Sequence, residues 1–158
     1  MSDSTFIKPD YQTEDETKAG NYFVSNYPPF SFWNDEDVPC VNSMINSPSQ
    51  GTAPLGIYYH VPFCRKRCHF CYFKVYTDKN SNDVRRYLSA TIEELRTYSE
   101  SPYLQGRKPK FVYFGGGTPS YLSAQQLTEL TDQMKAILPW DEAEEVTFEC
   151  EPGTLSEK

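Results

Sequence analysis

The sequence lacks a run of about 18 apolar residues, so it encodes no membrane-spanning helix. Residues 1–10 contain neither the basic segment nor the apolar segment of a secretory signal, which predicts a cytoplasmic protein. An excess of basic residues is also missing: 15 Lys and Arg face 22 Asp and Glu, for a net charge of -7. Because nucleic-acid-binding domains are usually basic, we expect no nucleic-acid partner. The 158 residues, of which 38% are hydrophobic, suit one soluble globular domain.

Charge divides the chain into two unequal parts. Residues 1–50 hold eight acidic and two basic residues, whereas residues 51–158 are nearly neutral. The first part is also rich in Ser, Asn and Pro, which predicts an extended acidic arm over residues 1–50. Pro28, Pro29 and Pro39 disfavour a helix in this arm. Its aromatic side chains favour docking onto the body of the protein; they are Tyr22, Phe23, Tyr27, Phe30, Phe32 and Trp33.

Three short segments of residues 51–158 have the pattern of β-strands. Residues 55–61 are β-prone and end at Pro62. Residues 111–114 are four apolar residues in a row, which predicts a strand buried on both faces. Residues 145–150 alternate between polar and apolar residues, and this alternation predicts a third strand with Cys150 facing the core.

Two amphipathic helices are predicted between these strands. Apolar residues recur at helical spacing over residues 84–98, behind an N-cap candidate at Asn82. Ser123 and Gln126 have the spacing of a capping box before a second apolar stripe over residues 127–138. The order β-α-β-α-β predicts an α/β fold with a parallel sheet.

Three motifs lie at or just after the carboxyl ends of the predicted strands, where parallel sheets bind ligands. They are residues 64–71, with three cysteines, residues 115–119, with three glycines, and residues 149–154. We therefore expect them to form one site. A closed (β/α)₈ barrel takes roughly 250 residues. The sequence therefore predicts a partial barrel, truncated after the third strand, in a piece of a longer protein.

Cysteine spacing predicts a metal centre. Five cysteines without a secretory signal disfavour a disulfide framework, and three of them form the pattern Cys64-x3-Cys68-x2-Cys71. Three thiolates on one loop can hold a [4Fe–4S] cluster and leave one iron open, although four thiolates are usual. A Cys₃His zinc site with His60 or His69, and unrelated reduced thiols, remain alternatives.

The motifs together resemble those of radical S-adenosylmethionine (SAM) enzymes. Residues 58–73 read YYHVPFCRKRCHFCYF and are similar to the cluster loop of the oxygen-independent coproporphyrinogen III oxidase family. That family also has a Gly-Gly-Gly-Thr-Pro segment after its second strand and a Glu-x-x-Pro segment after its third. Residues 115–119 and 149–152 match these two segments in the same order.

The resemblance implies a role for each matching residue. Cys64, Cys68 and Cys71 would bind three irons of a [4Fe–4S] cluster, and SAM would bind the fourth iron. Further contacts to SAM are implied for the residues Tyr58, Gly116, Gly117, Thr118 and Glu149. Tyr58 is the implied catalytic residue, and Phe70 matches a residue that contacts a second SAM molecule in the oxidase.

The implied reaction is reductive cleavage of SAM to a 5′-deoxyadenosyl radical. In the oxidase this radical leads to oxidative decarboxylation of coproporphyrinogen III to protoporphyrinogen IX. The implied partners are a tetrapyrrole or another small-molecule substrate and a low-potential electron donor such as a flavodoxin. The basic residues 65–67 either meet such an acidic donor or the propionates of the substrate, or form a solvated loop.

One position departs from the oxidase pattern. The oxidase has a further cysteine two residues after its third cluster ligand, and Phe73 stands there in this chain. A Cys-x-Phe ending is more similar to the haem-chaperone branch of the family and to other relatives. A haem chaperone with a retained cluster, and a radical SAM methyltransferase or cyclopropanase acting on a non-porphyrin substrate, are therefore the alternative functions.

Overall fold

The computed structural model describes residues 32–71 and 73–154. Most of the acidic arm, with Tyr22, Phe23, Tyr27 and Phe30, lies outside the described residues, so its predicted docking is not tested. The chain divides into two units, residues 1–38 and residues 39–158. The described part of the first unit contains the 3₁₀ helix η2 (Asp35–Asp37), whose first turn is capped by the Asn34 side chain. No helix in the described ranges is both long and apolar enough to span a bilayer.

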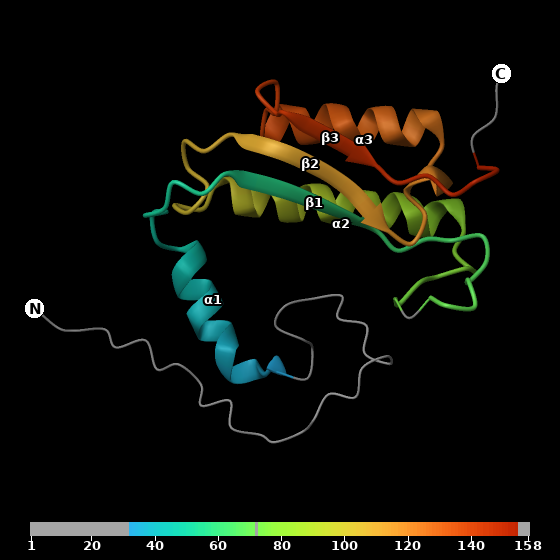
Figure 1. Cartoon of the computed structure of the whole chain (residues 1–158), viewed down its shortest axis with the longest axis horizontal. Coiled ribbons are helices and arrows are strands. Elements are labelled where there is room, and N and C mark those ends of the chain that lie inside the picture. The colour runs from blue at the N-terminus through green and yellow to red at the C-terminus, as the bar shows by residue number, and fades with distance from the viewer. Residues whose placement is uncertain (1–31, 72, 155–158) are drawn as a thin grey trace, which may run out of the picture. The chain divides into compact units, whose positions relative to one another are not determined.

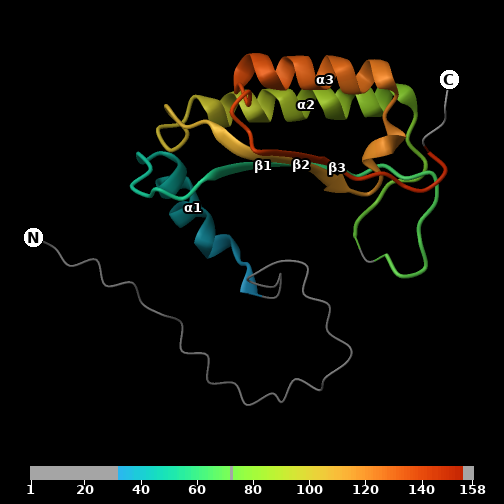
Figure 2. The same cartoon turned by 45° about the horizontal axis from the view of Figure 1, so that its top comes forward.

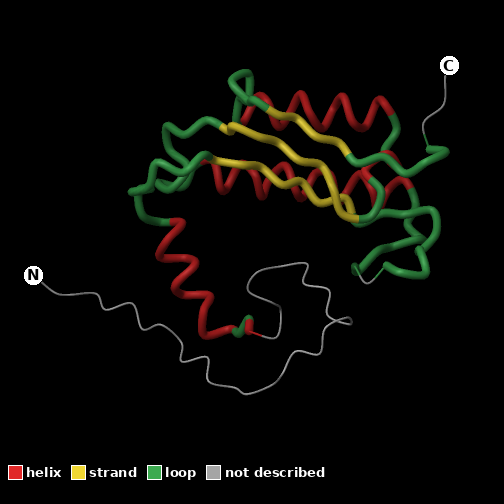
Figure 3. Tube along the Cα trace, in the orientation of Figure 1, coloured by secondary structure: helices red, strands yellow, loops and turns green. Residues whose placement is uncertain are grey.

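The body of the second unit is a parallel three-stranded sheet (Figures 1 and 3). Its strands are β1 (Leu55–Val61), β2 (Pro109–Gly116) and β3 (Glu145–Phe148), in the spatial order β1-β2-β3. The register pairs Tyr58 with Tyr113 and Tyr113 with Thr147. The predicted α/β fold with a parallel sheet is thus confirmed.

Two helices cover the same face of this sheet. They are α2 (Ser81–Ser99) and α3 (Ala124–Ile137), and Figure 2 shows both on one side of the three strands. The buried side chains between the helices and the sheet are apolar, and they include Val61, Val84, Ile92, Val112, Phe114, Leu130 and Met134. Burial of this apolar surface is the main source of stability in such a layer.

The other face of β2 is not buried, which corrects the prediction for residues 111–114. Val112 and Phe114 point into the core, whereas Phe111 is 45% exposed. In the described residues both helices pack on one face, so alternate side chains of the strand have no layer to pack against. Residues 111–114 therefore form a strand with one face packed on the helices and one face uncovered. Such a strand usually alternates between apolar and polar residues, but this one is apolar throughout.

Helix α2 begins two residues earlier than predicted. The N-cap is Asn80, whose side-chain oxygen accepts hydrogen bonds from the backbone N–H groups of Asn82 and Asp83. The Asp83 carboxylate in turn accepts from the Asn80 backbone N–H, which completes a capping box. Asn82 is therefore within the first turn and is not the cap. The capping box at Ser123 and Gln126 is confirmed at the start of α3.

A short helix, α1 (Val38–Ile45), forms although Pro39 predicts that no helix forms there. Pro39 is the second residue of this helix. The backbone N–H groups of the first turn have no partner within a helix, so the missing N–H of a proline costs no hydrogen bond there. The prediction against a helix in the arm is wrong for these residues.

The third strand ends before Cys150. Strand β3 stops at Phe148, and Cys150 is exposed. The prediction that Cys150 faces the core is therefore wrong. The backbone N–H of Glu149 still donates to the carbonyl of Phe114, which leads the chain out along the edge of β2.

Candidate metal centre and SAM site

The loop after β1 and the glycine segment after β2 lie against each other at the carboxyl edge of the sheet. The backbone N–H of Gly117 donates to the carbonyl of Val61 at 2.7 Å, and that of Thr118 donates to Phe63 at 2.9 Å. These bonds continue the pairing of β1 and β2 beyond the strands. They fix the glycine segment beside the first cysteine, as the sequence predicts for a common site.

Cys64 is buried and held from several sides. Its backbone N–H donates to the carbonyl of Tyr76 at 3.1 Å, and the Tyr76 N–H donates to Pro62 at 2.8 Å. The hydroxyl of Thr118 donates to the Cys64 sulfur at 3.3 Å. The sulfur thus has a defined position that does not depend on a bound metal.

Cys68 and Cys71 lie on a more open part of the same loop. Cys68 is exposed and Cys71 is partly buried. The Cys71 N–H donates to the Cys68 carbonyl at 3.1 Å, and the Arg67 guanidinium donates from Nε and Nη2 to the Cys71 carbonyl at 3.3 and 3.0 Å. All five cysteines are free thiols.

The thiols are not gathered into a finished metal site. Among the described residues, no three His, Cys, Asp or Glu side chains are close enough to hold a metal ion. This applies both to the three thiols and to a Cys₃His set with His60 or His69. The donor chemistry nevertheless suits a cluster, because three free thiols lie on one loop and the first is already fixed in place.

Two glycines are required by close approach of their neighbours. A Cβ on Gly117 would lie 2.9 Å from the Cys64 sulfur and 2.9 Å from the Val61 carbonyl oxygen. Gly116 has a φ of 113°, a conformation that other residues rarely adopt, and its Cβ would lie 2.7 Å from the His60 ring. The glycines therefore let the segment approach the cysteine loop and the histidine closely.

A chain of aromatic and acidic side chains crosses the uncovered face of the sheet. The rings of Tyr58 and Tyr113 stack with centroids 6.0 Å apart, and the Tyr58 hydroxyl lies 3.0 Å from Nδ1 of His60. At the other end, the Tyr113 hydroxyl donates to Oε1 of Glu149 at 2.5 Å. The register that pairs Tyr58 with Tyr113 places these groups side by side.

Burial and Glu149 set the electrostatics of this chain of side chains. Partial burial raises the pKa of Tyr58, and the Glu149 charge raises it further. The hydrogen bond to Glu149 is the largest cause of the raised pKa of Tyr113. Burial lowers the pKa of His60 against the opposing effect of Glu149. Both tyrosines therefore keep their protons near neutral pH, and His60 favours its neutral form.

The predicted site residues are not all brought together. Cys64, Gly116, Gly117 and Thr118 are in mutual contact or adjacent, and Tyr58 is joined to Glu149 through Tyr113. In contrast, Phe70 is 89% exposed on the cysteine loop. The structure does not test the role of any of these residues, so the assignments from the resemblance stay predictions.

The sequence analysis does not identify Tyr113 as a residue of the candidate site. The prediction of a strand buried on both faces assigned it to the core, whereas it is partly exposed and bonded to Glu149. Strand alternation was the available signal: if Val112 and Phe114 face the helices, Tyr113 faces the opposite side with the predicted ligands.

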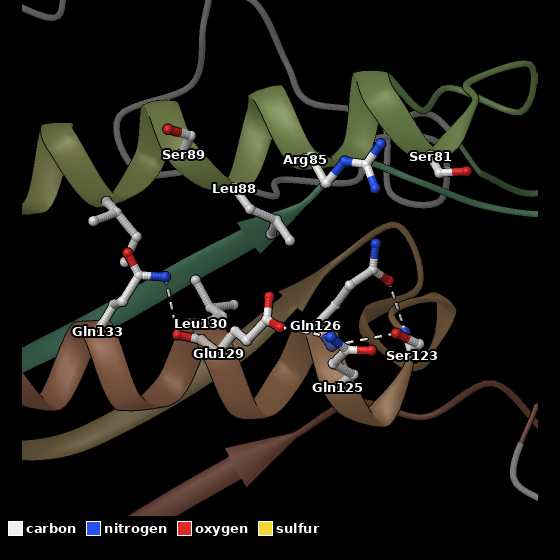
Figure 4. Close-up of a pocket in the computed structure, with 11 residues that line it drawn as sticks. Ser81, Arg85, Leu88, Ser89, Ser123, Gln125, Gln126, Glu129, Leu130 and Gln133 are labelled. Atoms are coloured by element: carbon white, nitrogen blue, oxygen red, sulfur yellow. Dashed lines mark hydrogen bonds between the residues drawn. The ribbon is translucent and has the colours of Figure 1, made fainter.

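A separate groove lies between α2 and α3 (Figure 4). Figure 4 shows that its walls carry Arg85 and Ser89 from α2 and Gln126, Glu129 and Gln133 from α3. It contains none of the predicted cysteine, glycine or Glu149 positions. The carboxyl edge therefore remains the candidate site.

Comparison with known proteins defines the class. The model of the radical SAM superfamily matches residues 58–158, which begin within β1 and include the cysteine loop, the glycine segment and Glu149. The chain belongs to the radical SAM superfamily. This confirms the superfamily that the three motifs indicated.

Within that superfamily, the chain is similar to two kinds of protein. It is 35% identical over 102 residues to the heme chaperone HemW of Escherichia coli, covering 65% of this chain and 26% of that protein. It is 30% identical over 102 residues to the oxygen-independent coproporphyrinogen III oxidase of the same organism, covering 65% of this chain and 22% of the oxidase.

A solved structure agrees with these similarities. Coproporphyrinogen III oxidase (HemN) from Escherichia coli, described as a radical SAM enzyme, matches with a TM-score of 0.62 and 26% sequence identity. The match covers 78% of this chain and 27% of the oxidase chain. The chain thus spans about a quarter of the length of the proteins it resembles.

Proposed function

We propose that this chain binds a [4Fe–4S] cluster through Cys64, Cys68 and Cys71 and binds SAM along Gly116–Thr118 and Glu149. One observation carries the proposal: the glycine segment is hydrogen-bonded to the exit of β1, directly beside the buried Cys64. A ligand held by the cysteine loop would therefore lie beside the glycine backbone. It could also contact the carboxylate of Glu149, which the Tyr113 hydroxyl holds in place by a hydrogen bond.

The residues of this chain would bind and orient the two cofactors. Once bound, a reduced cluster and SAM supply one-electron cleavage of a carbon–sulfur bond and hence radical chemistry. Gly116 and Gly117 give backbone access that a Cβ would block, and Glu149 provides a carboxylate for the cationic amino group of SAM. Tyr58 covers the same face of the sheet and is the proposed residue nearest the reacting atoms, while Phe70 is the proposed contact to a second SAM molecule.

The default reaction is oxidative decarboxylation of coproporphyrinogen III to protoporphyrinogen IX in the whole protein. The similarity to the coproporphyrinogen III oxidases in sequence and in fold supports it. The exposed basic residues Arg65, Lys66 and Arg67 suit substrate propionates or an acidic low-potential donor such as a flavodoxin. A cytoplasmic location remains a prediction, in keeping with five free thiols.

A haem chaperone with a retained cluster is the second candidate. Phe73 occupies the position where the oxidase pattern has a further cysteine, and the heme chaperone HemW is among the relatives. The two functions share the cluster and differ in the fate of the tetrapyrrole. The oxidase changes its substrate, and a chaperone returns haem unchanged.

Anaerobic reconstitution with iron and sulfide tests the shared part of the proposal. Electron paramagnetic resonance (EPR) of the reduced chain should show a cubane signal that shifts when SAM is added, because SAM would bind the open iron. Metal analysis of the same sample should give iron and sulfide in equal amounts. Stoichiometric zinc without sulfide would contradict the cluster and favour the Cys₃His alternative.

Two further incubations of the whole protein separate the candidate functions. With coproporphyrinogen III, SAM and a low-potential reductant, an oxidase forms protoporphyrinogen IX and 5′-deoxyadenosine. With haem, a chaperone shows a saturable change in the haem absorption spectrum and no change in the porphyrin. Turnover of the porphyrinogen would reject the chaperone, and tight haem binding without turnover would reject the oxidase.

A further inference from the structure

The side chain of Thr118 has a contact that is distinct from the backbone role proposed above. Thr118 is only 6% exposed, and its hydroxyl donates to the Cys64 sulfur at 3.3 Å. A hydroxyl in a buried position needs a hydrogen-bond partner, and here that partner is the sulfur of a proposed cluster ligand.

The hydroxyl is placed by the backbone, independently of any cofactor. The Thr118 N–H donates to the Phe63 carbonyl at 2.9 Å, and the Thr118 carbonyl accepts from the Tyr121 N–H at 2.9 Å. The next residue, Pro119, is fully buried at the start of η3 (Pro119–Tyr121). Removal of the hydroxyl should therefore leave the path of the glycine segment unchanged.

The three proposed ligands differ in their surroundings. Cys64 is buried and accepts a hydrogen bond from a side-chain hydroxyl, whereas Cys68 is exposed. The Cys71 sulfur is instead the donor in its contact, a long one of 4.0 Å to the carbonyl of Phe73. Among the described residues, Thr118 is thus the side chain that donates a hydrogen bond to a proposed ligand sulfur.

We propose that Thr118 is a positioning residue that raises the reduction potential of the cluster through its hydrogen bond to Cys64. This inference rests on the proposed cluster. Hydrogen bonds to ligand sulfurs and solvent exposure both set the potential of iron–sulfur clusters. A donor withdraws charge from the sulfur and stabilises the reduced cluster, which carries one more negative charge. Reduction by a low-potential one-electron donor is thereby made easier.

Three chains reconstituted in parallel test this inference: wild type, Thr118→Val and Thr118→Ser. The midpoint potential of each cluster is measured by EPR on samples poised at a series of potentials. Thr118→Val keeps the shape of the side chain and removes the donor, so its potential should fall below that of wild type. Thr118→Ser keeps the hydroxyl and should stay at the wild-type value.

Pulsed EPR supplies a readout that a merely structural role would not move. In D₂O, solvent at the exposed Cys68 and the backbone N–H groups of the loop contribute deuteron couplings in all variants, so the test is one further coupling that is present in wild type and in Thr118→Ser and lost in Thr118→Val. If Thr118→Val does not take up iron, Thr118→Ala removes the same donor with less bulk and is compared in its place.

The outcomes separate this inference from the proposed function. A loaded Thr118→Val or Thr118→Ala chain with the wild-type potential and deuteron coupling would overturn the role of Thr118 and leave the cluster intact. An equal fall in potential in Thr118→Ser would also overturn it, because a hydroxyl would then not suffice. Failure of wild type to form any cubane would overturn the proposed function itself.

Discussion

The helix-covered face of the sheet and its carboxyl edge are built on different physical principles. On the covered face, Val112, Leu130 and Met134 exclude water and gain stability from apolar burial. At the edge, Cys68 and Glu149 are exposed, and backbone hydrogen bonds hold the segments in place. Substitutions at the carboxyl edge should therefore leave the fold intact. Ligands can likewise bind at this edge with little change in the stability of the helix-covered core.

Strand β2 belongs to both regions and shows how they are joined. Val112 and Phe114 face the helices, while Tyr113 points to the opposite face and reaches Glu149. The strand ends at Gly116, which lies against His60, and Gly117 follows it beside Cys64. Core residues, site residues and the closely packed glycine segment thus follow one another along β2. Neighbouring positions of this strand should therefore respond differently to substitution.

Cys68→Ala should have the largest effect at the carboxyl edge: complete loss of the cubane cluster. Two remaining thiolates on the loop cannot hold three irons. The fold should be unaffected because Cys68 is exposed and takes no part in the core. Iron and sulfide analysis after anaerobic reconstitution measures the loss, and circular dichroism measures the fold.

Cys150→Ala is the matched control for this experiment. Cys150 is also an exposed free thiol, but it lies after β3 and outside the cysteine loop. It should load iron as wild type does. A Cys68→Ala chain with the iron content of wild type would contradict the cluster assignment and the contrast between the two regions.

Leu130→Ala should have the reverse effect, with loss of stability and retention of cofactor chemistry. Leu130 is 1% exposed in the core between α3 and the sheet. Replacement of such a residue by alanine costs about 2–5 kcal/mol, through lost burial and the cavity left behind. Urea unfolding measures the cost. Iron bound per folded chain should not change.

The exposed Thr128 on the same helix provides the control for Leu130. Thr128→Ala should change the free energy of unfolding by no more than about 0.5 kcal/mol, as is usual for surface positions. A loss of iron in Leu130→Ala at temperatures where the chain is fully folded would show that the core and the edge are not independent.

The sequence predicts the sheet and its two covering helices because each of these elements has a local signal, whereas it predicts no helix where α1 forms. Alternating strands and amphipathic helices define the parallel sheet, and the Ser123 capping box marks the start of α3. The three motifs are also predicted to meet, since parallel strands end at one edge. The hydrogen bonds of Gly117 and Thr118 to the exit of β1 confirm that meeting for the first two motifs.

The errors arise where tertiary packing decides between equal local signals. The apolar run at residues 111–114 fits a strand buried on one face as well as a strand buried on both. Which of the two forms depends on how many helices cover the sheet, and the local sequence does not determine that number. Asn80 and Asn82 are both able to cap a helix, and Asp83 at the third helical position selects Asn80. The bond from Tyr113 to Glu149 depends on strand register, which no motif encodes.

Glu149→Ala should weaken SAM binding by about tenfold to a hundredfold and leave the cluster in place. A hydrogen bond to a charged group contributes about 1.5–3 kcal/mol, and about 1.4 kcal/mol corresponds to a factor of ten in affinity. Titration of the reconstituted chain with SAM, followed by the EPR shift, measures the dissociation constant. Iron content should match that of wild type because Glu149 is not a thiol of the loop.

Tyr113→Phe refines this prediction and should have a smaller effect. It removes the hydroxyl that fixes Oε1 of Glu149 and keeps the ring stacked on Tyr58. SAM affinity should fall by less than in Glu149→Ala, and Tyr113→Phe should add nothing in a chain that already lacks Glu149. Additive losses in the double variant would mean that Tyr113 acts on SAM by a separate route.

Tyr87→Phe should produce the smallest change and concerns the one described hydrogen bond from α2 to the carbonyl of His60. The Tyr87 hydroxyl donates to this carbonyl at 2.5 Å, so it connects the core helix to the end of β1 beside the site. Burial, followed by the charge of Glu94, raises the Tyr87 pKa from 10.0 to about 12. Below pH 10 the hydroxyl is protonated in both states, and its removal should cost about 0.5–1.5 kcal/mol.

Between pH 10 and 12 the unfolded chain releases the proton of Tyr87 before the folded chain does, so the stability that the hydroxyl contributes is lost as pH rises. The difference in urea unfolding between wild type and Tyr87→Phe should therefore shrink across this window. Tyr59 is present in both chains, and its pKa is raised first by burial, with Tyr87 only a lesser cause. A difference that stays constant from pH 8 to 11.5 would show that Tyr87 does not couple the core to the edge through this hydrogen bond.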